Sequence, residues 1–456
     1  MEKTAVAPSE QPRAANRVIS GTRSVCPVCL EVIDARYVAR GERIYMEKQC
    51  KKHGAFTALV WEGAEEFERL VRAGEGQPCP SGPQHCIGCR QHAQKTCCVL
   101  LEVSDRCNLS CPVCFAGSSE AVATPDPSLA TIAGWYDMLM QNGGPFNIQL
   151  SGGEPTMRDD LPEVIRLGLE RGFSFFQLNT NGLRLAQEPD YVQRLAQAGL
   201  NTVFLQFDGI RDTTYEAIRG RPLFDEKVRA IAHCRQAGLG VVLVPTVAKG
   251  VNDHELGDIV AFAKGQMPHV RGVHFQPMSF FGRYQEDLAD SGRLTIPALL
   301  RALEQQSRGE IKKGDFSPAN TEHPLCSFHA DYLLEEGRFV LQPSCESACC
   351  CSVPSDQARR VVARKWSAPE VYAPTPPEEG SLYRADALDA FLQQRAEVER
   401  RQFALSGMAF QDAFNLDLNR LGRCYIAEVS PDGHLVPFCA YNLTGTDHAG
   451  FYRGVK

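Results

Sequence analysis

Three cysteines close together in the stretch "RCNLSCPVCF", residues 106–115, are the most chemically distinctive feature of this sequence. Cys107, Cys111 and Cys114 have the spacing C-x3-C-x2-C, which lets three thiolates reach one metal centre from a single loop. A [4Fe–4S] cluster normally takes four protein ligands, so this triplet leaves one iron for a small molecule. The spacing alone leaves open a zinc site, or a storage cluster completed by Cys97 or Cys98.

A glycine-rich stretch, "LSGGEPTMRDDL", follows at residues 150–161. Gly152 and Gly153 stand between a predicted strand and a predicted helix, where glycine lets a ligand approach the backbone closely. Glu154 can accept a hydrogen bond from an ammonium group. Taken alone, the stretch is an ordinary strand-to-helix turn. Its place one strand–helix unit after the cysteine triplet indicates a cofactor site.

A second set of metal-ligand types lies near the N-terminus. Cys26-Pro-Val-Cys29 and Cys50-Lys-Lys-His53 are two ligand pairs separated by a strand-rich stretch. This spacing is typical of a tetrahedral knuckle for zinc or iron, and such sites are often purely structural.

A third group of cysteines precedes the first strand of the main domain, in a segment rich in glycine and proline. Four of them suit an auxiliary [4Fe–4S] cluster: Cys79, Cys86, Cys89 and Cys97. Cys98 points away from its neighbour in an extended chain, so that only one of the adjacent pair is expected to ligate. The remaining C-terminal cysteines show no ligand spacing that we can assign: Cys326, Cys345, Cys349, Cys350, Cys351, Cys424 and Cys439.

The composition limits the class of protein. The N-terminus lacks the apolar core of a signal peptide, and no run of about 18 apolar residues is present. We therefore expect a cytoplasmic protein in which 19 clustered cysteines bind metal rather than form disulfides. A net charge of -7 without a basic run argues against binding to nucleic acid.

Strand and helix patterns alternate from about residue 99. The strands are expected at 98–104, 146–152, 173–180, 202–209, 240–247 and 272–279, and the helices at 129–141, 160–172, 190–199, 225–238 and 253–266. This alternation predicts an α/β fold with a parallel sheet, and the apolar strands predict burial on both faces. Functional groups are then expected at the C-terminal ends of the strands.

The chain divides into five parts by composition and pattern. We expect a disordered tail over 1–20, a knuckle domain over 21–75, an auxiliary-cluster segment over 76–98, a barrel over 99–300 and an extension over 301–456. The knuckle domain should contain strands at 43–50 and 55–61 and a helix at 65–74. In the extension we expect a linker over 352–380, an amphipathic helix over 388–406 and a hairpin over 422–442, with a turn at Asp432-Gly433. Each strand of that hairpin should carry one cysteine.

The cysteine triplet followed by Gly-Gly-Glu-Pro resembles the radical S-adenosylmethionine (SAM) superfamily. In that family the amine and carboxylate of SAM bind the open iron, and reductive cleavage yields a 5′-deoxyadenosyl radical that abstracts hydrogen from an unactivated carbon. The resemblance covers residues 99–285 and implies a partial (β/α)6 TIM-like barrel, which matches the six predicted strands.

The resemblance also implies a set of cofactor-binding residues. The turn Gly152, Gly153, Glu154 and Pro155 should contact the methionyl amine, and Asn179, Thr180 and Asn181 should lie near the ribose or carboxylate. Asp208 and Thr246 follow the next two strands. Helix caps use the same residue types, so each of these polar residues has a structural alternative.

The order of motifs over most of residues 20–445 is similar to the branch containing archaeal tetraether lipid synthase and the class D methylases. This similarity implies C–H activation and C–C bond formation, either by alkyl coupling of a lipid or by methylation of a small molecule. Class D methylases draw on methylene-tetrahydropterin for a one-carbon unit. A ferredoxin or flavodoxin would supply electrons, and a lipid substrate would bring peripheral membrane contact.

Two alternatives stay open at this point. A peptide-modifying radical SAM enzyme with auxiliary clusters would need a downstream C-x2-C pattern and a peptide-clasping domain, neither of which is evident. A non-enzymatic iron–sulfur electron carrier, or a zinc-scaffolded binding protein, would not need the barrel or the Gly-Gly-Glu-Pro turn.

Overall fold

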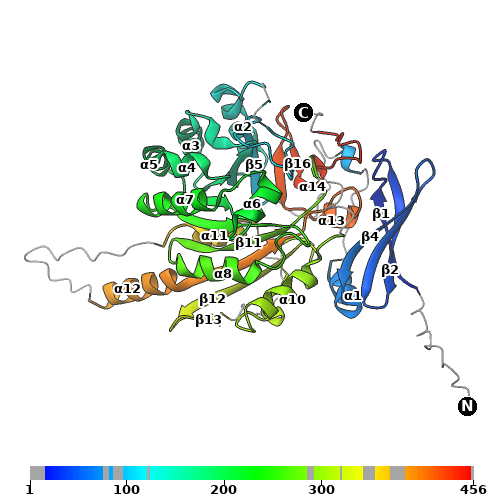
Figure 1. Ribbon diagram of the computed structural model, residues 1–456. Coiled ribbons are helices and arrows are strands. Elements are labelled where there is room, and N and C mark those ends of the chain that lie inside the picture. The colour runs from blue at the N-terminus through cyan, green and yellow to red at the C-terminus, as the bar shows by residue number, and fades with distance from the viewer. Residues whose placement is uncertain are drawn as a thin grey trace, which may run out of the picture.

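The computed structural model describes residues 16–74, 82–85, 96–119, 121, 124–284, 292–318, 321–342, 355–369 and 386–452. A long twisted sheet carries helices along its outer side, and a smaller β unit lies beside it (Figure 1). Within the described residues, no helix is long and apolar enough to cross a membrane.

The smaller unit is a four-stranded antiparallel sheet whose strands pair in chain order. It consists of β1 (Arg17–Val25), β2 (Val32–Arg40), β3 (Arg43–Cys50) and β4 (Gly54–Glu62), followed by α1 (Ala64–Ala73). The predicted strands β3 and β4 and the helix α1 are present, and β1 and β2 extend the sheet. Phe67 of α1 packs edge-on against Tyr37 of β2, which covers one face of this sheet.

The centre of the large sheet is made of the six predicted parallel strands, paired in chain order. They are β5 (Cys98–Ser104), β6 (Asn147–Gly152), β7 (Phe176–Thr180), β8 (Thr202–Gln206), β9 (Gly240–Val244) and β11 (Val270–Pro277), and the short β10 (Thr246–Val247) pairs with β11.

Helices connect these strands on the outer side. The predicted ones are α2 (Leu129–Gln141), α3 (Leu161–Leu169), α5 (Pro189–Gln197), α7 (Phe224–Gln236) and α8 (Leu256–Gly265). The structure adds α4 (Leu183–Gln187), α6 (Asp212–Arg219) and α10 (Ile296–Gln306). Apolar residues of the strands and helices form one continuous core between the two layers.

C-terminal strands extend this sheet at both edges. At one edge β14 (Gln402–Met408) pairs parallel with β11 and is followed by β12 (Ser327–Glu335) and β13 (Arg338–Leu341). At the other edge β15 (Ile426–Val429) pairs parallel with β5 and is followed by β16 (Leu435–Pro437). The strand order has two ends, so the sheet is a partial barrel widened by the C-terminal extension.

Three expectations about the extension are corrected. The predicted helix over 388–406 ends early, because α12 (Asp386–Arg401) gives way to β14, whose Phe403 and Leu405 are buried between neighbouring strands. The predicted linker contains α11 (Ser355–Trp366), an arginine-rich helix whose apolar side is limited to Val362, Ala363 and Trp366, which pack against the sheet. The hairpin over β15 and β16 is present, but Cys424 precedes β15 and Cys439 lies in α14 (Phe438–Tyr441).

Helix α11 covers the end of the sheet where the strands begin. Arg359 donates to the carbonyl of Thr96 over 2.8 Å, and its own carbonyl accepts from Asn147 Nδ2 over 3.0 Å. Trp366 packs edge-on against Phe204 of β8. Gly272 of β11 makes this packing possible, because a Cβ there would lie 2.1 Å from the carbonyl oxygen of Ala404 and 3.0 Å from the Trp366 ring.

We expect Gly272→Ala to lower the free energy of unfolding by about 1–3 kcal/mol, because the added methyl group forces apart β11 and β14. Gly134→Ala is the matched control. Gly134 lies inside α2 with nothing within 4 Å of the position of its missing Cβ, so alanine should stabilise the helix by up to about 1 kcal/mol. Urea unfolding followed by circular dichroism measures both; equal midpoints for the two variants would contradict this packing.

Candidate functional site

The predicted cysteine triplet lies in the loop that follows β5, at the C-terminal end of the sheet. Cys107, Cys111 and Cys114 pack against one apolar cluster, which includes Leu109 of the same loop and Tyr215 of α6. Cys111 is buried and the other two are half-buried. The structure therefore brings the three predicted thiols to one water-poor location.

Gly152 and Gly153 allow this loop to dock on the end of β6. A Cβ on Gly152, whose φ is 122°, would lie 2.2 Å from the carbonyl oxygen of Ser104. A Cβ on Gly153 would lie 2.3 Å from the carbonyl oxygen of Arg106. Glycine is thus needed at both positions for the close approach of the cysteine loop, and contact of these residues with SAM stays a prediction.

The Glu154 carboxylate joins the ends of β6 and β7. It is buried and accepts hydrogen bonds from Asn181 N (2.7 Å), from Thr180 Oγ1 (2.6 Å) and from the backbone and hydroxyl of Thr156. Asn181 Nδ2 in turn donates to Asn108 Oδ1 over 2.7 Å, within the cysteine loop. Three predicted cofactor-binding residues, Glu154, Thr180 and Asn181, therefore share one network, and their contact with SAM stays a prediction.

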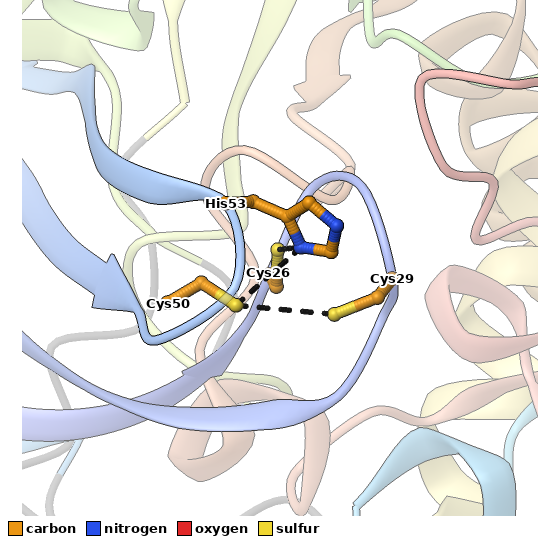
Figure 2. A group of neighbouring side chains, drawn as sticks. All are labelled: Cys26, Cys29, Cys50 and His53. Atoms are coloured by element: carbon orange, nitrogen blue, oxygen red, sulfur yellow. Dashed lines mark hydrogen bonds between the residues drawn. The ribbon is translucent and has the colours of Figure 1, made fainter.

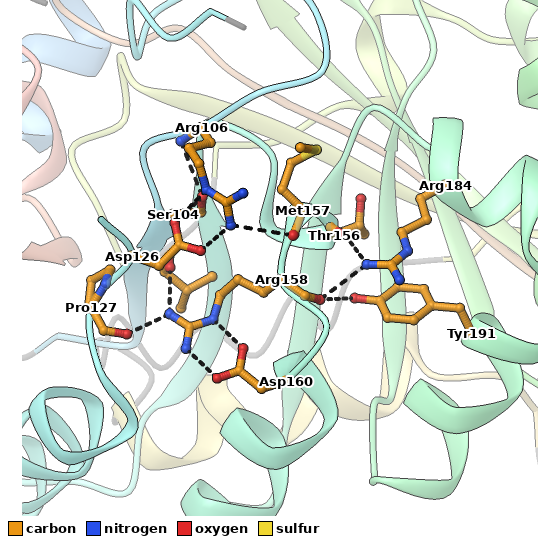
Figure 3. Close-up of polar contacts among 11 residues, drawn as sticks. Ser104, Arg106, Asp126, Pro127, Thr156, Met157, Arg158, Asp160, Arg184 and Tyr191 are labelled. Atoms are coloured by element: carbon orange, nitrogen blue, oxygen red, sulfur yellow. Dashed lines mark hydrogen bonds and ion pairs between the residues drawn. The ribbon is translucent and has the colours of Figure 1, made fainter. Parts of the chain in front are cut away.

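Two arginines hold the neighbouring loops together (Figure 3). Arg106 forms an ion pair with Asp126, which also accepts from Ser104 Oγ. Arg158 donates to the carbonyls of Val103 and Pro127 and pairs with Asp160. The loops after β5 and β6 are therefore held to one another.

A third arginine, Arg219, contacts the cysteine loop itself. It lies at the end of α6, is buried and forms a bidentate ion pair with Asp208 at 2.6 and 2.8 Å. Its guanidinium also donates to Thr246 Oγ1 over 3.0 Å and to the carbonyl of Val113 over 3.2 Å. Asp208 and Thr246 were predicted to bind cofactor; the structure places them on this arginine.

Sequence reasoning missed Arg219 and a second buried cation, Lys227 of α7. Lys227 Nζ donates to the carbonyl of Asn181 over 2.5 Å, and burial lowers its pKa to about 8. In a sequence, an arginine before a glycine at a helix end, or a lysine within a helix, normally predicts a solvent-exposed charge. Only the folding of α6 and α7 against the cysteine loop distinguishes these two.

The charges around the triplet fit an iron–sulfur cluster. Burial raises the pKa of Cys107 to about 12 and also raises that of Cys111, whereas nearby Arg219 acts to lower the pKa of Cys111. Buried thiols ionise only when positive charge compensates them. A metal cluster, Arg219 and Lys227 would together provide that charge, so the donor set suits a cluster bound by three thiolates.

The segment after β11 clamps the loop from the other side. Arg283 Nε donates to the carbonyl of Cys111 over 2.7 Å and Arg283 Nη2 to that of Ser118 over 2.8 Å. The backbones of Cys114 and Arg283 also exchange two hydrogen bonds, at 2.8 and 2.9 Å. These contacts fix the positions of Cys111 and Cys114 independently of any ligand.

The predicted knuckle residues converge at one point (Figure 2). The ligand atoms of Cys26, Cys29, Cys50 and His53 all lie within 4.8 Å of one another. His53 Nδ1 is 3.5 Å from the sulfurs of both Cys26 and Cys50, and the sulfurs of Cys29 and Cys50 are 4.0 Å apart. A Zn–S bond of about 2.3 Å in tetrahedral geometry separates ligands by about 3.8 Å, so these four fit zinc.

The backbone N–H of Lys52 prepares this site for a metal. Together with the amide and ring of His53, it lowers the pKa of Cys50 to about 6. No other group of three or more such side chains lies this close together within the described ranges. The knuckle prediction therefore corresponds to a compact four-ligand site.

The proposed auxiliary-cluster cysteines are mostly outside the described residues: Cys79, Cys86 and Cys89. Cys97 is buried next to β15, and its amide donates to the carbonyl of Tyr425 over 2.9 Å. The structure also gathers Cys326, Cys424 and Cys439, which interact electrostatically with one another beside the buried Arg420. These three cysteines are far apart in the sequence, so their spacing did not predict that they would lie together. Cys345, Cys349, Cys350 and Cys351 lie outside the described residues.

Comparison with known families identifies two parts of the chain. A profile of the radical SAM superfamily matches residues 101–263, which contain the cysteine triplet and the strands β6 to β9. A profile described as the HMPTM N-terminal zinc ribbon domain matches residues 18–62, which contain all four knuckle ligands. Both matches fall on the sites described above.

Similar proteins align with either most of this chain or its barrel part alone. The 7,8-dihydro-6-hydroxymethylpterin dimethyltransferase of Methanocaldococcus jannaschii is 32% identical over 470 residues, covering 92% of this chain and 93% of that one. The GTP 3′,8-cyclase of Erythrobacter litoralis is 29% identical and covers 45% and 60%. Among solved structures, Streptococcus suis SuiB bound to S-adenosylmethionine is 14% identical with a TM-score of 0.39, covering 47% of each chain.

The identity to the pterin dimethyltransferase extends over almost the full length of both chains, zinc ribbon included. The chain belongs to the radical SAM superfamily and, within it, to the family of this dimethyltransferase.

Proposed function

We propose that this radical SAM enzyme methylates a carbon atom of a pterin, a reaction that forms a C–C bond. The observation that carries the proposal is that one buried and two half-buried thiols lie beside two buried cations, Arg219 and Lys227, at the C-terminal end of the barrel. The full-length similarity to a pterin dimethyltransferase supports methylation as the reaction and a pterin as the substrate class.

The residues that would hold the cofactors follow from the site. Cys107, Cys111 and Cys114 would bind a [4Fe–4S] cluster, and the turn Gly152–Pro155 with Asn179 to Asn181 would surround the SAM bound to it. Bound together, the cluster and SAM supply the 5′-deoxyadenosyl radical that removes hydrogen from an unactivated carbon. The zinc ribbon would hold its ion through Cys26, Cys29, Cys50 and His53.

The rest of the site orients and protects these groups. Arg219 and Lys227 compensate the negative charge of the thiolates, and Asp208 holds the Arg219 guanidinium in place. Leu109, Leu183 and Leu223 exclude water from the cysteines, which protects a reactive radical from side reactions. Arg283 fixes the loop against the segment after β11.

The proposal includes partners and a second cluster. A ferredoxin or flavodoxin of the cytoplasm would supply the electron, and Cys79, Cys86, Cys89 and Cys97 would hold an auxiliary [4Fe–4S] cluster. Coupling of lipid chains is the second candidate reaction, and the substrate assay below distinguishes it from methylation.

The test is an anaerobic assay of the iron-reconstituted protein with dithionite, SAM, 7,8-dihydro-6-hydroxymethylpterin and a methylene-tetrahydropterin as the one-carbon donor, analysed by mass spectrometry. We expect 5′-deoxyadenosine together with a pterin heavier by one or two methyl groups. Formation of 5′-deoxyadenosine with unchanged pterin would contradict the substrate. A lipid extract that yields coupled chains in the same assay would favour the second reaction.

We expect Cys111→Ala to lose about four irons per chain, because a cubane cluster cannot be retained on two thiolates. Cleavage of SAM should be lost with it, while the zinc content stays unchanged. Cys234→Ala is the matched control, since Cys234 is buried in α7 away from the site. Metal analysis and the 5′-deoxyadenosine assay measure both variants; full iron content in Cys111→Ala would contradict the ligand assignment.

Cys50→Ala should instead remove one zinc per chain and leave the iron content unchanged, because the knuckle and the cysteine loop lie on different domains. Loss of a structural zinc ligand should also destabilise the ribbon, and we expect earlier proteolysis within residues 16–74. Elemental analysis and limited proteolysis measure these effects. Retention of zinc at wild-type affinity would show that the ion lies elsewhere.

A further inference from the structure

The inner face of the barrel is accessible and polar. Towards the C-terminal ends of β8 and β11 the residues that face the helices, such as Leu205 and Phe275, are buried, whereas the inward Gln206, His274 and Gln276 are only half-buried. Side chains alternate between the two faces of a strand, so this pattern marks an interior that solvent can enter.

Strand register shows which residues share this inner face. Gln149 of β6 lies opposite Gln177 of β7, and Asn179 of β7 lies opposite Phe204 of β8. His274 of β11 lies opposite Ser406 of β14. The half-buried polar residues of the inner face are Glu102, Gln149, Asn179, Gln206, His274, Gln276 and Ser406; Phe204 and Val244 are half-buried apolar residues on the same face.

Hydrogen bonds hold several of these side chains in fixed orientations. Gln177 Nε2 donates to Asn179 Oδ1 over 2.7 Å, and Asn179 Nδ2 donates to Gln149 Oε1 over 3.2 Å. Gln149 Nε2 donates to the sulfur of Cys98 over 2.6 Å. A row of amides therefore crosses β6 and β7, already ordered before a ligand binds.

Gln206 has an acceptor that is not used. Its Oε1 is buried and has no hydrogen-bond partner among the described residues. Leaving such an acceptor unsatisfied costs free energy, and buried polar groups in proteins nearly always have a partner. A donor from a molecule inside the barrel would satisfy it.

The polar face lies directly below the cysteine loop. Asn179 is followed by Thr180, which donates to Glu154, and by Asn181, which donates to Asn108 of that loop. Gln206 is two residues before Asp208, the partner of Arg219. A ring bound against Gln149 and Gln206 would therefore lie next to the site where the radical forms.

We propose that Gln149 and Gln206 determine the substrate by binding the edge of a small nitrogen heterocycle that carries both N–H donors and carbonyl or ring-nitrogen acceptors, with Asn179 holding the Gln149 amide in place. This inference rests on the proposed function and adds the residues that read the substrate. An alkyl chain in the same place would leave Gln206 Oε1 without a partner, at a cost that disfavours a lipid substrate.

The test measures KM for 7,8-dihydro-6-hydroxymethylpterin in Gln206→Met and in Gln149→Met, two changes that keep side-chain length and remove the amide. Gln193→Met is the matched control, because Gln193 is exposed on α5. We expect KM to rise about tenfold in each inner-face variant, the effect of one lost hydrogen bond, and to stay unchanged in the control. Iron content and circular dichroism confirm that each variant is folded and loaded.

The outcomes separate this inference from the proposed function. Methylation of the pterin with an unchanged KM in both inner-face variants would overturn the inference and leave the function standing. Absence of methylated pterin in the wild-type protein would overturn the function; equilibrium dialysis of the pterin against wild-type and Gln206→Met protein then decides the inference. Equal binding of the pterin to both proteins would contradict a polar substrate site. Binding of phospholipid that is tighter in Gln206→Met than in the wild-type protein would also contradict it.

Discussion

The buried ion pair between Arg219 and Asp208 is the interaction on which the candidate site depends. The guanidinium contacts the end of β8, the start of β10 and the backbone of the cysteine loop at the same time. Breaking such a pair from one side leaves a buried charge and costs about 3–5 kcal/mol. The pair therefore fixes the loop and holds the Arg219 guanidinium next to Cys111.

The other contacts of the site serve the same purpose, to bring loops from separate strands to one position. Glu154 joins the ends of β6 and β7, Arg158 joins the loops after β5 and β6, and Arg283 joins the loop to the segment after β11. Each uses a charged group, buried for Glu154 and Arg158 and half-buried for Arg283, to satisfy backbone atoms outside the sheet and helices. Three thiols can thus be held in place before any metal is present.

The zinc ribbon and the C-terminal extension are linked in a comparable way. Tyr37 donates to Asp417, Thr22 donates to the same carboxylate over 2.9 Å, and Lys48 Nζ donates to the carbonyl of Ala413 over 2.6 Å. The segment that receives these bonds leads from β14 to β15, the strands on opposite edges of the barrel. The ribbon therefore supports the connection that widens the barrel on both sides.

Much of this could be predicted from the sequence, because local signals were strong. Apolar strands and capped helices gave the six-stranded core, and the spacing of Cys107, Cys111 and Cys114 and of the ribbon ligands identified both metal sites as candidates. The failures were non-local. Residues 402–406 continued a helical pattern and became a central strand only through pairing with β11 and β12. Nothing in the sequence around Arg219, Lys227 and Gln206 distinguishes them from other polar residues. Their roles arise only from the residues that the fold packs beside them.

A redox titration of the cluster tests most directly the claim that buried cations stabilise it. The midpoint potential would be followed by the EPR signal that changes when SAM is added, in the wild-type protein and in Arg219→Gln with equal iron content. Because reduction adds negative charge, loss of the adjacent cation should make reduction harder and lower the midpoint potential. Asp208→Asn should raise the midpoint potential. Potentials that stay at the wild-type value in both variants would contradict the account.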